Sequence, residues 1–301
     1  METRGCGTAL VTPFRVDGEL DTHALVSLVH WQIESGIDFL VVCGSTGEAA
    51  TLEEDEWLQT VRLVVETAAT RVPVWAGCTH NSTRTLVRQA KKLIQIPGID
   101  AILSANPYYN KPSQEGQYQH FAALAEAVQP IPVVLYNVPG RTAVNLEPET
   151  VLRLARAYPN IQAIKEASGK LAQIAAIHAG APAGFKVFSG DDSLALPAIE
   201  AGAQGLVSVA SNEIPYEMTA MLRAALQANW PPARDIERLY APLFAANFWE
   251  PNPAPVKAIL SLMGRSNAHL RLPLVQPTAP TQRRLEALAA ELGLLRPTPQ
   301  I

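Results

Sequence analysis

One lysine interrupts a strongly apolar stretch of the chain. The run Ile161-Gln162-Ala163-Ile164 ends at Lys165 and predicts a strand that is buried on both faces. Burial lowers the pKa of a lysine from about 10.4 toward about 7–8, where the neutral amine can attack a carbonyl. A structural ion pair with Glu166 is the alternative, although neighbouring strand residues point to opposite faces. The position of Lys165 alone leaves both interpretations open.

A tyrosine ends the preceding predicted strand, at a height similar to that of Lys165. A buried tyrosine such as Tyr136 is more often a core aromatic with one hydrogen bond. Its phenol can relay protons if other hydroxyls bond to it and offset its usual pKa of about 10. Ser45 or Thr46, together with Tyr108 or Tyr109, could supply those hydroxyls.

Two further features could bind carboxylates. The loop 44–47 begins and ends with glycine, which lets backbone N–H groups approach an anion closely, although a tight turn would use the same residues. Arg141 follows the strand of Tyr136. By default it is a solvated surface residue, but its planar guanidinium suits a carboxylate.

Other chemistries find no support in the sequence. The histidines are dispersed, without an acidic partner at ligand spacing, so neither a metal site nor a histidine triad is expected. No phosphate-binding Gly-x-x-x-x-Gly-Lys loop occurs. We therefore expect chemistry without a cofactor or a metal, with Lys165 as its best candidate.

Composition limits the partners and the compartment. The chain of 301 residues is 48% hydrophobic and carries a net charge of −4 without a basic block, so nucleic acid is not an expected partner. No apolar stretch is long enough to span a membrane, and the N-terminus lacks the pattern of a secretory signal. Cys6, Cys43 and Cys78 are odd in number and lack metal-ligand spacing. We therefore expect a reduced, soluble, cytoplasmic protein.

Strand-like and helix-like segments alternate along the chain. The expected strands are Gly7–Phe14, Ile37–Gly44, Val72–Gly77, Asp100–Asn106, Ile131–Val138, Ile161–Ser168, Phe185–Gly190 and Gln204–Ser211. The expected helices are Leu20–Ser35, Glu53–Thr70, Thr83–Gln95, Glu115–Val128, Pro148–Ala157, Leu171–Ala179, Leu194–Ala201 and Pro215–Asn229. Thr51, with Glu54 three residues later, is an expected helix cap.

This alternation predicts a (β/α)8 barrel over residues 1–230, since such barrels are typically about 250 residues long. An open, doubly wound sheet is the rival, but no Gly-x-Gly-x-x-Gly follows the first strand. Catalytic groups in these barrels lie at the carboxyl ends of the strands. From Trp230-Pro231-Pro232 onward the chain is helical and rich in proline. We therefore expect a C-terminal helical region over residues 231–301.

Several motifs together resemble the dihydrodipicolinate synthase (4-hydroxy-tetrahydrodipicolinate synthase) family. Its superfamily also contains N-acetylneuraminate lyase and 2-keto-3-deoxy-sugar-acid aldolases. The similarity runs from Gly7–Phe14 to Glu250–Lys257, through Gly44-Ser45-Thr46-Gly47-Glu48, Tyr136-Asn137-Val138-Pro139 and Ile164-Lys165-Glu166-Ala167. The segments Asn106–Gly116 and Gly140-Arg141-Thr142 resemble the synthases more than the lyases.

The resemblance implies catalytic roles for four residues. Lys165 would condense with pyruvate, and the resulting enamine would attack L-aspartate 4-semialdehyde on the diaminopimelate route to lysine. Tyr136 would donate and accept protons. It would be connected to Ser45 and to Tyr109, the latter reaching in from the adjacent subunit.

The resemblance also implies how substrates and subunits are held. Thr46 and the backbone near Val207 would bind pyruvate, and Arg141 the carboxylate of the aldehyde. Tight dimers would form a homotetramer.

The sequence departs from the family pattern in two places. Ser45 stands where many synthases have threonine, which keeps the hydroxyl. The second departure concerns the interface residues of enzymes that L-lysine inhibits. Two positions match and four differ: Asn81 and Tyr108 are kept, whereas Glu54 and Trp57 replace histidines, Ala49 a serine and Thr85 a glutamate. Inhibition by lysine is therefore not expected.

Two other functions compete with the synthase. One is a Schiff-base aldolase for a sugar-derived 2-oxo acid, against which Arg141 and the Tyr108–Gly116 loop argue. The other is a barrel without catalysis that binds pyruvate as a signal. Loss of Lys165 or Tyr136 would have indicated it, and both are present.

Overall fold

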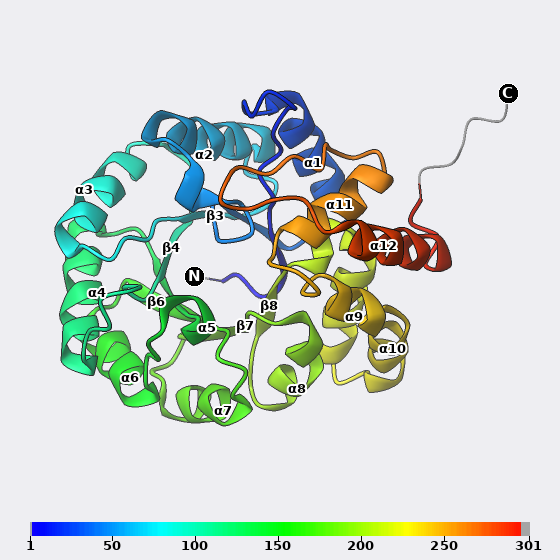
Figure 1. The fold of residues 1–301 in the computed structure, drawn as a ribbon. Coiled ribbons are helices and arrows are strands. Elements are labelled where there is room, and N and C mark those ends of the chain that lie inside the picture. Colours follow the sequence, from blue (N-terminus) through cyan, green and yellow to red (C-terminus); the bar gives the residue numbers. More distant parts are fainter. Residues whose placement is uncertain (1, 296–301) are drawn as a thin grey trace, which may run out of the picture.

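Strands from the whole first two thirds of the chain form one closed barrel. The computed structural model describes residues 2–295, and within them eight parallel strands pair in sequence order, with β1 also pairing β8 (Figure 1). The strands are β1 (Gly5–Ala9), β2 (Phe39–Val42), β3 (Val74–Gly77), β4 (Ala101–Ala105), β5 (Val133–Asn137), β6 (Ile161–Glu166), β7 (Lys186–Ser189) and β8 (Gly205–Ser208). The predicted barrel is confirmed, and the open sheet is excluded because β1 and β8 close the ring.

Helices follow the strands and form an outer ring (Figure 1). They are α1 (Thr22–Glu34), α2 (Glu54–Ala68), α3 (Thr83–Leu93), α4 (Gln114–Val128), α6 (Pro148–Ala157), α7 (Leu171–Gly180), α8 (Ala195–Glu200) and α9 (Pro215–Leu226). Each matches a predicted segment. The short helix α5 (Pro139–Thr142) was not predicted.

The predicted cap of the second helix was wrong. Thr51 ends a short 3-10 helix, η1 (Ala49–Thr51), instead of starting α2. The capping box uses Glu53, whose backbone N–H donates to the Glu56 carboxylate at 2.9 Å. A glutamate in this role also places its negative charge at the positive end of the helix dipole.

The barrel interior has a packed aromatic floor. Phe39, Trp75 and Phe188 point inward, with ring centroids 4.3 to 5.5 Å apart. Strand residues two apart share a face, so Tyr136 follows Val134 inside the barrel, next to the floor. The strands contain continuous apolar runs because their outer faces are covered as well, by the helices.

Three further helices follow Trp230. They are α10 (Trp230–Ala246), α11 (Ala254–Leu262) and α12 (Ala279–Glu291), and they lie beside α1 and α9 (Figure 1). Most of their buried apolar side chains join the same hydrophobic cluster as the barrel helices, and Val256 and Leu260 of α11 pack in a smaller cluster with Leu28 of α1. The division of the chain at residue 230 stays a prediction. None of the helices within residues 2–295 has the length and hydrophobicity needed to cross a membrane.

Candidate active site

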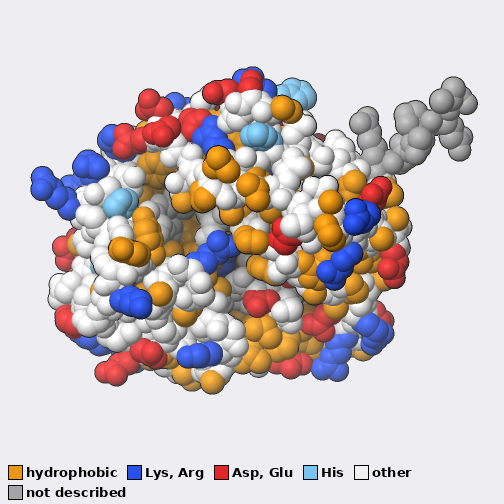
Figure 2. Space-filling model, in the orientation of Figure 1, with side chains coloured by type: hydrophobic (Ala, Val, Ile, Leu, Met, Phe, Trp, Pro, Cys, Tyr) orange, Lys and Arg blue, Asp and Glu red, His pale blue; other side chains and the backbone are white. Residues whose placement is uncertain are grey.

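Lys165 and Tyr136 meet at the carboxyl end of the barrel. They are register partners on β6 and β5, and the Lys165 Nζ atom lies 4.4 Å from the centroid of the tyrosine ring. Their exposed fractions are 6% and 7%. The barrel face that carries α5 and α11 is hollowed near its centre (Figure 2). The two side chains that the sequence singled out therefore form one site.

Glu166 does not pair with Lys165. Its carboxylate points outward and accepts hydrogen bonds from the Asn137 amide at 2.9 Å, the Ser168 N–H at 2.7 Å and the Gln173 amide at 3.2 Å. Burial raises the pKa of this carboxyl, while these donors oppose the rise. Within the described residues no carboxylate forms an ion pair with Lys165. The predicted orientation of Glu166 is confirmed.

A glycine makes room for the lysine side chain. A Cβ atom at Gly190, just after β7, would lie 2.8 Å from Cε of Lys165 and 2.7 Å from Cβ of Ala167. Contacts this short do not occur, so any larger residue would displace the lysine. Sequence reasoning placed Gly190 at a strand end but gave it no role.

The loop after β2 brings two hydroxyls to the same end of the barrel. Ser45 is half-buried and Thr46 is buried. The Thr46 hydroxyl donates to Oδ1 of Asn252 at 3.0 Å, and the Thr12 hydroxyl donates to the Gly47 carbonyl at 2.6 Å. The loop is thus tied both to the chain after β1 and to the segment before α11.

Asn252 joins two predicted binding residues. Besides accepting from Thr46, it accepts at its backbone carbonyl from Nη2 of Arg141, 3.3 Å away. Arg141 itself lies on α5 and is exposed. Asn252 is only 4% exposed, and its Nδ2 has no hydrogen-bond partner among residues 2–295. Sequence reasoning quoted this position within a motif but missed it as a site residue.

The backbone beyond β8 is held by a buried carboxylate. Oδ2 of Asp192 accepts the N–H groups of Val209 at 3.1 Å and Ala210 at 3.0 Å. Burial raises the pKa of Asp192, and these two donors oppose the rise. Val207 lies fully buried inside the barrel, in the same interior cluster as Tyr136. The strand that was predicted to contact pyruvate is therefore firmly placed.

The predicted tyrosine pair lies at the edge of the molecule. Tyr109 adopts a positive φ of 75° and is 86% exposed, whereas Tyr108 is 37% exposed. Within the described residues no hydrogen bond links Tyr136 to the hydroxyl of Ser45 or Tyr109. One chain thus brings together Lys165 and Tyr136 but leaves Tyr109 projecting away.

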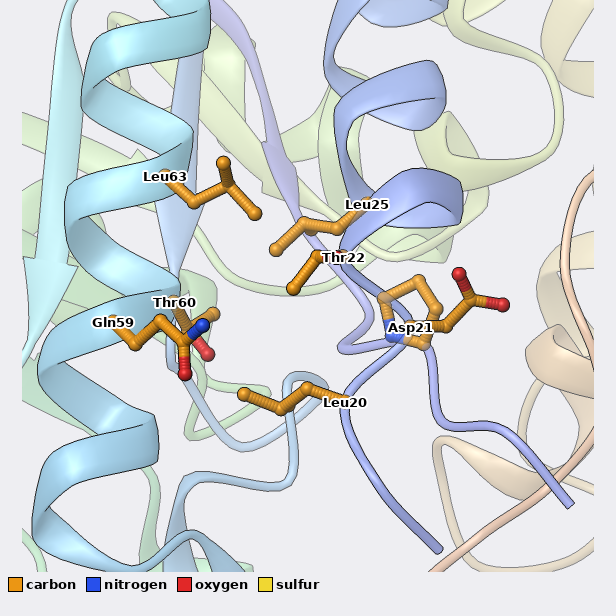
Figure 3. Close-up of a pocket in the computed structure, with 8 residues that line it drawn as sticks. Leu20, Asp21, Thr22, Leu25, Gln59, Thr60 and Leu63 are labelled. Atoms are coloured by element: carbon orange, nitrogen blue, oxygen red, sulfur yellow. The ribbon is translucent and has the colours of Figure 1, made fainter. Parts of the chain in front are cut away.

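A separate space between α1 and α2 is unrelated to this site. It is too narrow to hold a water molecule and is lined by Leu20, Leu25, Leu63 and neighbouring residues (Figure 3). These side chains belong to the packing of two outer helices. Among residues 2–295, no cluster of three or more His, Cys, Asp or Glu could hold a metal ion, and the three cysteines are free and buried.

Comparisons with known proteins show the family of the chain. The model of the "Dihydrodipicolinate synthetase family" matches residues 2–292. The chain is 59% identical to a 4-hydroxy-tetrahydrodipicolinate synthase of Acidobacterium capsulatum and 56% identical to one of Koribacter versatilis, covering 99% and 98% of both chains, respectively. It also superposes on the crystal structure of dihydrodipicolinate synthase from Thermotoga maritima with a TM-score of 0.95 at 40% identity, covering 98% of this chain and 100% of that one.

Proposed function

The chain belongs to the dihydrodipicolinate synthetase family, and we propose that it condenses pyruvate, held as a Schiff base on Lys165, with L-aspartate 4-semialdehyde. This is the reaction of a 4-hydroxy-tetrahydrodipicolinate synthase, a lyase of the diaminopimelate route to lysine. The observation that carries the proposal is the buried amine of Lys165, which lies over the Tyr136 ring without a carboxylate partner in the described residues.

The chemistry follows from an amine in that place. The neutral amine of Lys165 attacks the ketone carbon of pyruvate, and loss of water leaves a protonated imine. The imine nitrogen withdraws electrons, so the methyl group loses a proton and becomes a nucleophilic enamine carbon. This carbon forms the new bond to the aldehyde carbon, whose oxygen takes up a proton. The substrate amine then displaces Lys165 and closes the ring.

Tyr136 is proposed to carry the protons. Its ring lies against the lysine amine, so its hydroxyl belongs to the same site as the nitrogen that gains and loses protons in these steps. Ser45 and a Tyr109 from the adjacent subunit would complete the relay. The exposure of Tyr109 supports this, because an aromatic side chain that projects from its own barrel is available to a neighbour. A homotetramer built from such dimers is part of the proposal.

The remaining site residues are proposed to hold the two carboxylates. Thr46 and the backbone near Val207 would receive pyruvate beside Lys165. Arg141 stands at the mouth, where its exposed guanidinium would bind the carboxylate of the aldehyde.

Reductive trapping tests the nucleophile. Borohydride added with pyruvate should leave a covalent adduct on the peptide that contains Lys165, as measured by peptide mass mapping. Lys165→Ala should lose both the adduct and most of the activity while staying folded. Lys170→Ala, which changes an exposed lysine nearby, should keep both. An unmodified Lys165, or an adduct confined to surface lysines, would reject the mechanism.

A further inference from the structure

The loop that carries Ser45 and Thr46 is bounded by two backbone conformations that favour glycine. Cys43 has a φ of 54° and Glu48 a φ of 52°, and neither is glycine. A side chain in this left-handed region costs free energy, so the conformation persists only where surrounding contacts impose it. Contacts with other parts of the chain must therefore stabilise the conformation of this loop.

At Glu48 those contacts come from the C-terminal region. Oε1 accepts a hydrogen bond from Nζ of Lys257 on α11 at 2.5 Å, and both side chains are fully buried. Oε2 accepts the backbone N–H of Arg271 at 3.1 Å. The ring of Phe14 lies beneath this pair, with its centroid 4.4 Å from Nζ of Lys257. Partners more than 200 residues away thus fix the last residue of the loop.

Stability alone does not explain this pair. Removing two charges from water costs about as much as their attraction returns, and apolar replacements of buried pairs are often neutral or stabilising. Burial lowers the pKa of Lys257 to about 8 even with Glu48 beside it, which indicates how large that desolvation is. An ion pair is directional, whereas an apolar contact is not. The pair therefore fixes the direction of the Glu48 side chain, and through it the backbone conformation of Glu48.

We propose that Lys257 is a positioning residue that acts through Glu48 to hold Ser45 and Thr46 in the geometry that receives pyruvate. Thr46 lies two residues before Glu48, and the same C-terminal segment also binds the Thr46 hydroxyl through Asn252. The C-terminal region therefore fixes the loop at two points. This inference rests on the proposed roles of Ser45 and Thr46.

The test separates positioning from folding with a neutral double variant. Lys257→Met with Glu48→Gln removes both buried charges, and the glutamine can still accept the Arg271 N–H. The matched control is Arg234→Met with Glu200→Gln, which likewise replaces a cation by methionine and a glutamate by glutamine, in an exposed pair with a 3.1 Å contact. Thermal unfolding shows that each protein is folded. Steady-state kinetics and borohydride trapping at Lys165 are then measured against pyruvate concentration.

The expected result is a selective loss of pyruvate recognition. The KM for pyruvate and the half-saturation of trapping should both rise by on the order of tenfold to a hundredfold. The KM for the aldehyde and the control protein should change little. If the double variant does not fold, Glu48→Asp, which keeps both buried charges and shortens the side chain by one methylene, should fold and show the same shift at smaller size. An unchanged pyruvate KM in either folded variant overturns the inference, as does a fall in kcat alone.

Two other outcomes would contradict the proposed function and not the positioning role of Lys257. Absence of an adduct on Lys165 in the unaltered protein would refute the proposed nucleophile. An unchanged pyruvate KM in Thr46→Val would refute the proposed role of Thr46. If the adduct forms and Thr46→Val raises the KM but the Lys257 variants do not, only the positioning role is wrong.

Discussion

Tyr109 is the site residue whose proposed role depends entirely on a second chain. It is 86% exposed, its backbone has a positive φ of 75°, and no hydrogen bond joins it to Tyr136 in the described part of the chain. If it works in the neighbouring site, a defect in Tyr109 and a defect in Lys165 should complement one another when they lie on different subunits.

The arrangement of sites predicts the size of this complementation. In a two-fold dimer each site takes Lys165 from one subunit and Tyr109 from the other. A hybrid of one Lys165→Ala subunit and one Tyr109→Phe subunit then has one intact site and one doubly defective site. Its turnover should be about half that of the unaltered dimer. The two parent homodimers should be lower by about a hundredfold or more, as expected for loss of a positioned proton-transfer group or nucleophile.

Two different affinity tags on co-expressed subunits select assemblies that contain both variants. In a tetramer only the mixed dimers regain an intact site, so kcat should lie far above that of both parents and reach at most half that of the unaltered protein. If Tyr109 served its own site, neither site of the hybrid would be intact, and the hybrid would be as inactive as the parents. That result would refute the exchange of tyrosines between subunits. The control hybrid combines Lys165→Ala with Tyr216→Phe, another exposed tyrosine, and should keep half the activity in either case. If Tyr109→Phe is silent while Tyr108→Phe is not, the two tyrosines were assigned in the wrong order.

Three other predictions follow from the same structure. Tyr136→Phe should lower kcat by about a hundredfold or more, with an unchanged unfolding temperature, because its hydroxyl bonds to no described residue. Burial and the nearby His80 lower the pKa of His120 to about 4. The unfolded state, with a pKa near 6.5, therefore binds the proton first as the pH falls. Between pH 7 and pH 5, His120 should lower the free energy of unfolding by about 2 kcal/mol. Denaturant titrations at the two pH values should therefore show a decrease smaller by this amount in His120→Gln. Finally, L-lysine below millimolar concentration should not half-inhibit the enzyme in a steady-state titration.

The strands were predictable because each is short, apolar and buried on both faces. Lys165 was found for the same reason, since a charge in such a run stands out. Lys257 is just as deeply buried but lies on a helix, where polar residues recur every few positions and none is conspicuous. Its partner Glu48 is 209 residues away, a pairing that no local pattern reports.

Backbone conformation explains most of the other structural features that the sequence did not predict. The sequence indicates a left-handed residue only through glycine or asparagine, yet Cys43, Glu48 and Tyr109 adopt positive φ values. Tertiary contacts impose these conformations, so they appear only in the folded chain. The helix α5 has four residues, too few for a helical period to be visible.

The predicted insensitivity to lysine depends on what the substituted residues do in this fold. Trp57 fills the place of a histidine, and its indole N–H, the only polar group of its side chain, donates to the Gly77 carbonyl at 3.0 Å. Its indole N–H is therefore not available to a ligand. Thr85 supplies a hydroxyl where a glutamate would neutralise an ammonium, and it lies in the first turn of α3. Two of the groups that the family resemblance assigns to lysine binding are therefore missing.

Glu54 is the one new carboxylate that could replace the lost charge, but it is already paired. It forms an ion pair with Lys92 of α3 at the surface, so a bound ammonium would have to share its charge with Lys92. Each 1.4 kcal/mol of lost attraction lowers affinity about tenfold, and an ammonium buried without a counter-charge loses several times that amount. Lys92→Ala would free Glu54, and any sensitivity to lysine should be greater in that variant than in the unaltered protein. Half-inhibition of the unaltered protein well below millimolar lysine, with lysine density beside Tyr108 and Asn81, would overturn this reasoning.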